Sequence, residues 1–203
     1  MTVQSRCPVN RLRWMEEMRA APIILLGLLV VTACAFLVRV RAQTRTDSKA
    51  DPKDVYQGLR DLALQSSRIK LRLPPVPTPT TPWGVIMDWG VARGTATVVA
   101  FSDGTASIYF SSGGGFIGGS ESHDSIRNAA KRLVAIAAEF QLQAHPAPSY
   151  PLPERGGVVF YFLTDSGVFS AVASEDDLRK HRHALSKLGD AAQEVITQYR
   201  RAQ

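Results

Sequence analysis

The feature that most constrains this chain is a run of nineteen residues, 20–38, without a charged side chain. The run lies between Arg19 and Arg39 and consists mainly of Ile, Leu, Val and Ala. As a helix it would be about 28 Å long, close to the roughly 30 Å hydrocarbon thickness of a bilayer. We therefore expect one transmembrane helix at residues 20–38 and a single-pass location in the cell membrane.

Two alternatives for this run stay open. The residues Val40-Arg41-Ala42 loosely fit the cleavage rule of a signal peptide. The residues Val31-Thr32-Ala33-Cys34 are similar to a bacterial lipobox, in which Cys34 would carry the lipid. Four basic residues lie upstream of the run and five lie downstream. The positive-inside rule therefore does not decide on which side of the membrane the rest of the chain lies.

The charge of the chain is unevenly distributed. Residues 1–82 hold 13 Lys and Arg against 6 Asp and Glu, a net of +7, whereas residues 83–203 hold 11 against 12, a net of −1. Basic flanks beside an apolar run favour contact with anionic lipid headgroups, and a neutral globular part does not favour nucleic acid. We expect membrane lipids as partners through residues 20–38 and their basic flanks, together with a protein partner, no nucleic acid and no cofactor.

Composition also divides the chain into segments. Residues 1–19 are a basic N-terminal segment and residues 39–73 a basic juxtamembrane segment, in which Asp51-Pro52 starts a predicted short helix over 52–67. The last part of the juxtamembrane segment, 68–73, alternates basic and apolar side chains, which fits either an edge strand or a strip on the membrane surface. Five prolines in 74–82 favour an extended spacer in front of a globular domain at 83–203.

Within 83–203, β-rich runs alternate with amphipathic stretches. The turns Ser102-Asp103-Gly104 and Asp165-Ser166-Gly167 each join two such runs and predict hairpins. Apolar side chains recur at helical spacing over 126–140 and over 188–199. These patterns predict an α+β fold with a five-stranded antiparallel sheet (three strands, a helix, a two-strand hairpin, a helix) packed by helices. The predicted strands are 84–90, 95–101, 105–111, 158–164 and 168–173.

The most conspicuous motif is a glycine-rich loop at 111–124. It contains a GxGxxG pattern from Gly113 to Gly118, but six further residues precede the next helical stripe and no βαβ unit follows, so a dinucleotide site is not predicted. Exposed amides and hydroxyls there favour a small anion or a peptide instead. The candidate ligand-binding residues are Ser112, Gly113, Gly114, Gly115, Ser120, His123 and Asp124.

The same loop carries a catalytic alternative, because Ser120, His123 and Asp124 are the residue types of a nucleophile, a base and an orienting acid. Adjacent residues rarely reach one another in that way, and an N-cap role explains Asp124 as well. No catalytic residue is assigned on this basis. The charged stretch 175–183 has its two histidines, His181 and His183, at i, i+2, whereas a helical metal site uses i, i+3 or i+4, and no third distant ligand is evident. No metal is expected either.

Three segments, WGVIMDWG, GTATVVAFSDGTASIYFSSGGGFIGG and HALSKLGDAAQEVITQYR, resemble a family of small bacterial proteins with no assigned function. The resemblance covers about residues 83–201, through a WGV strand, a DGTxSxYFSxGGG hairpin and loop, and an EVITQ terminal helix. It implies a plasma-membrane destination but no activity. We therefore expect a membrane-anchored, non-catalytic binding or scaffold module that uses loop 111–124. The alternative is a small hydrolase or a nucleotide- or anion-binding enzyme with its site at the same loop.

Overall fold

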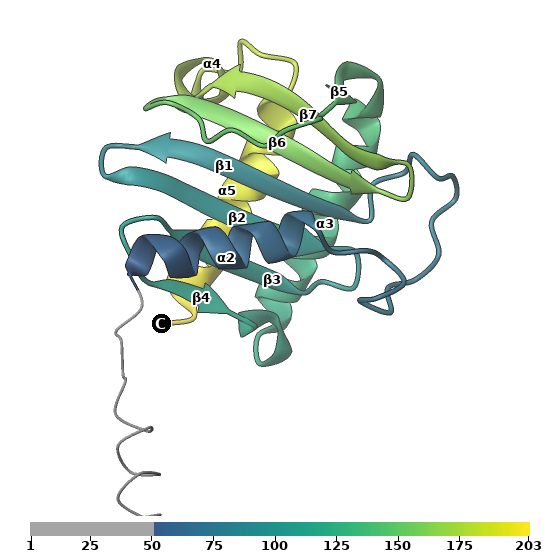
Figure 1. Ribbon diagram of the computed structural model, residues 1–203, viewed down its shortest axis with the longest axis horizontal. Coiled ribbons are helices and arrows are strands. Elements are labelled where there is room, and N and C mark those ends of the chain that lie inside the picture. The colour runs from purple at the N-terminus through teal and green to yellow at the C-terminus, as the bar shows by residue number, and fades with distance from the viewer. Residues whose placement is uncertain (1–50) are drawn as a thin grey trace, which may run out of the picture. The chain divides into compact units, whose positions relative to one another are not determined.

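The computed structural model describes residues 51–203, which fall within the unit Ala50–Gln203. Its centre is an antiparallel sheet of seven strands in the order β4-β3-β2-β1-β6-β7-β5. Helix α2 crosses one face of the sheet and helices α3 and α5 cover the other (Figure 1). The strands are β1 Gly84–Val91, β2 Gly94–Phe101, β3 Ala106–Phe110, β4 Gly115–Ile117, β5 His145–Pro146, β6 Gly157–Thr164 and β7 Gly167–Ser174. The α-helices are α2 Pro52–Leu64, α3 Asp124–Ala137, α4 Glu175–Arg179 and α5 Ser186–Arg201, and short 3-10 turns lie at Gly119–Glu121 and Ala138–Gln143.

Both predicted hairpins are confirmed. Strands β2 and β3 pair antiparallel on either side of the Asp103-Gly104 turn, where Gly104 has a φ of 93°. The Asp103 carboxylate accepts the backbone N–H of Thr105 at 2.8 Å, which closes the turn. Strands β6 and β7 pair from Gly157 to Thr164 in the same way. The α+β class and the antiparallel sheet therefore follow directly from local turn chemistry.

The predicted number of five strands is wrong. The glycine-rich segment turns back on β3 and adds β4, and the residues after α3 add the two-residue strand β5 beside β7. Strands of three and two residues are too short to show an alternating pattern. Position 115 also has no room for a side chain, because a Cβ there would lie 2.4 Å from the carbonyl oxygen of Ile108. Backbone pairing, which a hydrophobic pattern does not report, creates both edge strands.

Alternation along the strands divides the apolar residues between two cores. The larger core lies between the sheet and helices α3 and α5, with Val85, Phe160, Leu133 and Leu188 fully buried. The smaller core lies under α2, where Tyr56, Leu64 and Leu73 meet strands β1 and β6. A sheet covered on both faces explains why β1 and β6 read as nearly continuous apolar runs.

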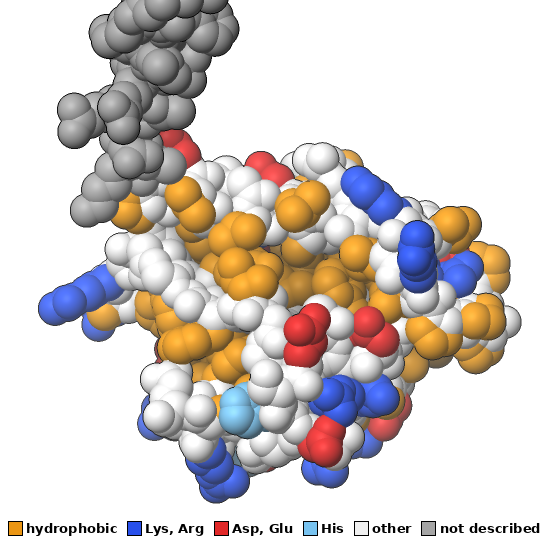
Figure 2. All heavy atoms as spheres, turned by 90° about the horizontal axis from the view of Figure 1, so that it is seen from below, with side chains coloured by type: hydrophobic (Ala, Val, Ile, Leu, Met, Phe, Trp, Pro, Cys, Tyr) orange, Lys and Arg blue, Asp and Glu red, His pale blue; other side chains and the backbone are white. Residues whose placement is uncertain are grey.

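The segment before residue 83 belongs to this unit rather than standing apart from it. Helix α2 ends at Leu64 rather than at residue 67, and residues 68–72 form turns, so the edge-strand alternative for 68–73 is wrong. The proline-rich segment 74–82 also contacts the fold, because the carbonyl of Pro79 accepts the N–H of Ser166 at 2.9 Å and Trp83 is 2% exposed. The predicted boundary at residue 83 therefore moves to Ala50. Seen from the β4 side, the surface of the protein has a hollow in which hydrophobic side chains gather (Figure 2).

The predicted transmembrane helix at 20–38, the lipidation alternative at Cys34 and the basic segment 1–19 lie outside the described residues. Among residues 51–203, no helix has both the length and the apolar character that crossing a bilayer requires. The fold class is accordingly corrected to a seven-stranded α+β sheet without a described membrane span.

Candidate functional site

The glycine-rich segment forms a tight turn rather than a phosphate cradle. Gly113 and Gly114 have φ values of 102° and 82°, and Gly115 then enters β4. Helix α3 begins only at Asp124, so the glycines do not lie at its N-terminus. A pyrophosphate site needs the helix amides next to the glycines. The turn therefore positions an edge strand, and Ser112 is exposed beside it.

The hydroxyl, imidazole and carboxylate of the catalytic alternative are separated by other contacts. Ser120 is buried at 3% exposure, whereas His123 and Asp124 are exposed. Arg127 forms an ion pair with Asp124 and donates a hydrogen bond to the carbonyl oxygen of Ser120 at 2.8 Å. Within residues 51–203, no hydrogen bond joins the side chains of Ser120, His123 and Asp124. Arg127 thus organises this segment as the start of α3.

A hollow of about 310 Å³ lies between β4, the start of α3 and the end of α5. Of the seven predicted site residues, Gly115 and His123 line it, while Ser112, Ser120 and Asp124 do not. Its wall includes Phe116 and Tyr199, whose rings stack with centroids 5.8 Å apart. Tyr199 is held in place because its hydroxyl donates to the carbonyl of Ala106 at 2.6 Å. The hollow is wide open, and the titratable side chains that line it are His123 and Tyr199.

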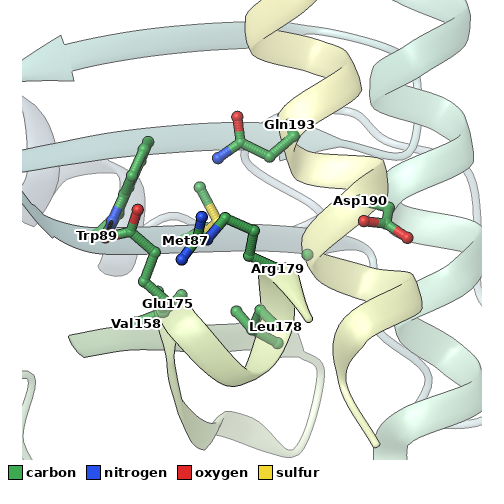
Figure 3. A pocket seen from close by; sticks show the side chains of 9 residues that line it. Met87, Trp89, Val158, Glu175, Leu178, Arg179, Asp190 and Gln193 are labelled. Carbon is green, nitrogen blue, oxygen red and sulfur yellow. Dashed lines mark hydrogen bonds between the residues drawn. The ribbon is translucent and has the colours of Figure 1, made fainter. Parts of the chain in front are cut away.

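A more enclosed cleft of about 320 Å³ lies between the sheet and helices α4 and α5, and we call it the Trp89 cleft (Figure 3). Its apolar lining comes from two central strands and from α4: Met87, Trp89, Val158 and Leu178. Its polar lining comes from the two helices: Glu175, Arg179, Asp190 and Gln193. An apolar pocket with a few polar groups at its rim is the usual form of a small-molecule site.

Strand register and a helix cap position the two central side chains of this cleft. Alternation along β1 places Met87 and Trp89 together on the face that α5 covers. Helix α4 follows β7 directly and is capped by Ser174, whose hydroxyl accepts the N–H of Asp177 at 3.1 Å. This cap brings Glu175 opposite the indole, and Trp89 Nε1–H donates to Glu175 Oε2 at 2.9 Å. The indole is therefore fixed at its polar end.

Helix α5 leaves room for the cleft at a glycine. A Cβ on Gly189 would lie 3.4 Å from the side chain of Leu178, so the missing side chain keeps this wall open. One turn later, Gln193 directs its amide toward Trp89, whereas Asp190 lies at the outer end (Figure 3). The amide is both a donor and an acceptor. The cleft thus combines an aromatic wall with adaptable hydrogen-bonding groups.

The charged groups at the mouth differ in how far they are already engaged. Arg179 forms an ion pair with Asp176 at 2.9 Å. Hydrogen bonds from Lys180 and Arg179 hold the pKa of Asp176 at about 2, so this carboxylate stays ionised as a partner for both. Glu175 uses Oε2 for the indole, and within residues 51–203 its Oε1 has no hydrogen-bond partner. Asp176 also pairs with Lys180 and Arg182 and so does not neutralise Arg179 by itself. Among the lining residues, the two carboxylates of Glu175 and Asp190 against the one cation of Arg179 give a net formal charge of −1.

A second cluster of titratable groups is buried on the opposite face of the sheet, beneath α2. Arg60 Nε donates to Asp88 Oδ2 at 2.8 Å, and Thr97 donates to Asp88 Oδ1 at 2.5 Å. Arg60 also donates to the carbonyl of Tyr150 at 2.9 Å, and Tyr56 exchanges a 2.8 Å hydrogen bond with Thr97. Burial raises the pKa of Asp88, and the bonds from Arg60 and Thr97 oppose that rise. Both charges are engaged by the protein itself, so we assign this cluster to holding α2 on the sheet.

Sequence reasoning missed the residues of the Trp89 cleft. Trp89 reads as core or edge cover, and Glu175 and Arg179 read as part of a solvated charged loop. One usable feature was Gly189, because a glycine inside an amphipathic helical stripe lowers helix stability and calls for a packing or functional reason. The pairing of β1 with β6, which brings α4 over Trp89, is not visible in local patterns.

Among residues 51–203, no group of three or more His, Cys, Asp or Glu side chains is placed to hold a metal ion. Comparison of the chain with protein-family models, curated proteins and solved structures found no match.

Proposed function

We propose that this chain is a non-catalytic binding module that takes a small amphipathic ligand in the Trp89 cleft. The observation that carries the proposal is the half-buried indole of Trp89, which forms one wall of an enclosed apolar cleft while Glu175 anchors its N–H at 2.9 Å. An anchored aromatic ring offers a large contact surface without loss of side-chain entropy on binding. Loop 111–124 stays a predicted ligand site, but of its predicted residues only Gly115 and His123 line the neighbouring hollow.

The charges at the cleft favour a ligand with an amine head group. Glu175 Oε1 is free to accept a hydrogen bond, and the lining holds two carboxylates, Glu175 and Asp190, against one cation, Arg179. A cationic head close to Trp89 would also gain a cation–π interaction with the indole. The apolar body of the ligand would contact Met87 and Leu178. An arylalkylamine or a short alkylamine fits these requirements better than a carboxylic acid does.

The hydrolase alternative has less support. Its serine, Ser120, is buried at 3% exposure, and its acid, Asp124, is paired with Arg127. A nucleophile must reach both its base and its substrate. For nucleotide binding, the glycines would have to lie at the N-terminus of α3, which starts beyond them. The enclosed Trp89 cleft needs no such rearrangement.

The test uses residues 50–203, which contain both hydrophobic cores, and follows indole N–H resonances by NMR. Titration with phenethylamine should shift the Trp89 resonance saturably, whereas Trp83, buried in the core under α2, serves as the internal control. The matched acid 3-phenylpropionate should cause little shift. Substitution Glu175→Gln keeps an acceptor for the indole but removes the charge, and should weaken amine binding about tenfold.

Two results would contradict the proposal. In the first, no amine of the panel shifts the Trp89 resonance at millimolar concentration. In the second, Trp83 and Trp89 shift in parallel, which would indicate a general solvent effect rather than binding. If amine and acid bind equally well and Glu175→Gln changes neither, the cleft binds apolar groups and the proposed head-group preference is wrong.

A further inference from the structure

The turn that follows α2 presents apolar and basic side chains to solvent in alternation. Ile69 is 79% exposed and Leu71 36% exposed, and Lys70 and Arg72 between and beside them are also exposed. Leu73 is the next apolar residue and is buried at 7%. Leu73 therefore packs into the fold, whereas Ile69 and Leu71 form an apolar tip that makes little contact with it.

The turn is held rigidly in this conformation. The backbone N–H of Leu71 donates to Ser67 O, that of Arg72 to Ile69 O, and that of Leu73 to Arg68 O, each at 3.0 Å. Arg72 has a φ of 56°, a left-handed conformation that a non-glycine residue keeps only when the surrounding structure imposes it. The exposed tip is therefore a built feature.

An ion pair attaches the turn to the domain and sets its net charge. Arg68 donates to both carboxylate oxygens of Asp165, with a shortest distance of 2.7 Å. In this contact the charges of Arg68 and Asp165 offset each other. Among the ion pairs of residues 51–203, none involves Lys70 or Arg72. Two cations thus remain free beside two exposed aliphatic side chains.

The exposed flank of α2 adds further apolar side chains, but carboxylates rather than cations lie beside them. Val55 and Leu62, seven residues apart and therefore on one side of the helix, are 48% and 61% exposed. Asp54 and Asp61 occupy the neighbouring side by the same spacing. Ile117 of β4, 68% exposed, lies opposite Ser107 on the sheet face that α2 crosses. Figure 2 shows hydrophobic side chains gathered on the β4 side of the molecule, with both basic and acidic side chains around them.

We propose that the turn 68–72 is a membrane-contact element, which inserts Ile69 and Leu71 among the lipids of an anionic bilayer while Lys70 and Arg72 bind its phosphate headgroups. Aliphatic side chains with adjacent Lys and Arg are the combination that an anionic interface stabilises, through apolar burial and headgroup attraction together. A protein partner would equally use Ile69 and Leu71, but two free cations and no free carboxylate at the tip favour a surface of phosphates. This element is independent of the Trp89 cleft.

The test places an environment-sensitive NBD fluorophore on the full chain at an Ile69→Cys substitution, with Cys7 and Cys34 replaced by serine. The matched control is Val172→Cys, a β-branched position of similar exposure, 67%, on strand β7. Vesicles made of equal parts phosphatidylcholine and phosphatidylglycerol are then added. They should shift the NBD emission at position 69 to the blue and make it sensitive to quenching by brominated lipids. Emission at position 172 should stay as in buffer. Vesicles of phosphatidylcholine alone should give a smaller shift at position 69.

A second comparison separates local from overall charge. Substitutions Lys70→Gln and Arg72→Gln together should abolish the blue shift at position 69. Substitutions Lys131→Gln and Arg132→Gln on the exposed side of α3 remove the same charge from the other face of the sheet and should leave the shift unchanged. The proposal is overturned if positions 69 and 172 respond alike, if the shift does not depend on phosphatidylglycerol, or if both charge-removal pairs have the same effect.

Discussion

Replacing Asp88 with alanine would test whether a buried ion pair holds helix α2 on the sheet. The Arg60 and Asp88 side chains are 2% and 0% exposed, and their closest atoms are 2.6 Å apart. The guanidinium also lies 5.6 Å from the ring centroid of Tyr161. With the carboxylate removed, Arg60 keeps its bond to the carbonyl of Tyr150 but loses Asp88, its one ion-pair partner among residues 51–203.

The expected loss follows from the charge that remains behind. Removing one partner of a buried pair costs about 3–5 kcal/mol, because the other charge stays in a low-dielectric site. A domain of this size is stable by about 5–15 kcal/mol, so the substitution removes a large part of the total. The double substitution Arg60→Met with Asp88→Leu removes both charges and should recover most of the loss. Thr97 keeps its 2.8 Å bond to Tyr56 throughout.

Urea unfolding followed by far-UV circular dichroism measures these free energies. The matched control is Asp165→Ala, which breaks the exposed pair with Arg68, and it should cost no more than about 1 kcal/mol. The reasoning is refuted if Asp88→Ala costs no more than Asp165→Ala. It is also refuted if the double substitution costs as much as the sum of Arg60→Met and Asp88→Leu measured singly, because the charges would then not be coupled.

Three further outcomes are expected. Gly90→Ala should lower the free energy of unfolding by about 1–3 kcal/mol, because its Cβ would lie 1.9 Å from the carbonyl oxygen of Glu154. Gly189→Ala lies within α5, and its added Cβ would have its nearest contact at 3.4 Å, so it should instead raise the free energy of unfolding by up to about 1 kcal/mol. If both variants shifted the urea midpoint in the same direction, these two expectations would be contradicted. Burial raises the pKa of Tyr161 and of Tyr199 to about 12, whereas tyrosine in the unfolded chain ionises near 10.0. The stability that these two groups contribute below pH 10 should therefore be lost as the pH rises toward 12, and tyrosinate absorbance should increase together with unfolding. If both tyrosines ionised near pH 10 while the protein was still folded, this expectation would be contradicted.

Local chemistry predicted the hairpins and the main helices well. The Asp103-Gly104 turn has few alternatives, since glycine at positive φ and an aspartate that caps the next N–H both favour it. The number of strands could not be predicted in this way. Strand β4 exists because Gly113 and Gly114 allow a reversal and because β3 has a free edge. A free edge is a property of the assembled sheet.

The boundary at residue 83 failed for a related reason. Prolines at 74–82 do favour an extended backbone, but extension does not decide whether that backbone lies in solvent or on a sheet. The uncovered face of β1 and β6 decides it, because Ile86, Tyr161 and Leu163 need a cover. Helix α2 supplies that cover, and Arg60 within it meets Asp88 across 28 positions of sequence.

The candidate site shows the same limit. Sequence patterns drew attention to Ser120, His123 and Asp124 because these residues are adjacent and chemically versatile. The structure directs Asp124 to Arg127 and buries Ser120. The Trp89 cleft assembles residues from β1, β6, α4 and α5, and none of these elements shows the cleft by itself.

The sequence by itself determined the α+β class, the two hairpins, the amphipathic helices and the division of charge between the two parts of the chain. Each of these depends on interactions over a few residues, which composition and periodicity report. Only the tertiary structure decided the seven-strand order, the cover that α2 provides, the Trp89 cleft and the exposure of Ile69. These depend on which surfaces are left after the strands have paired, and burial is a property of the whole packed chain.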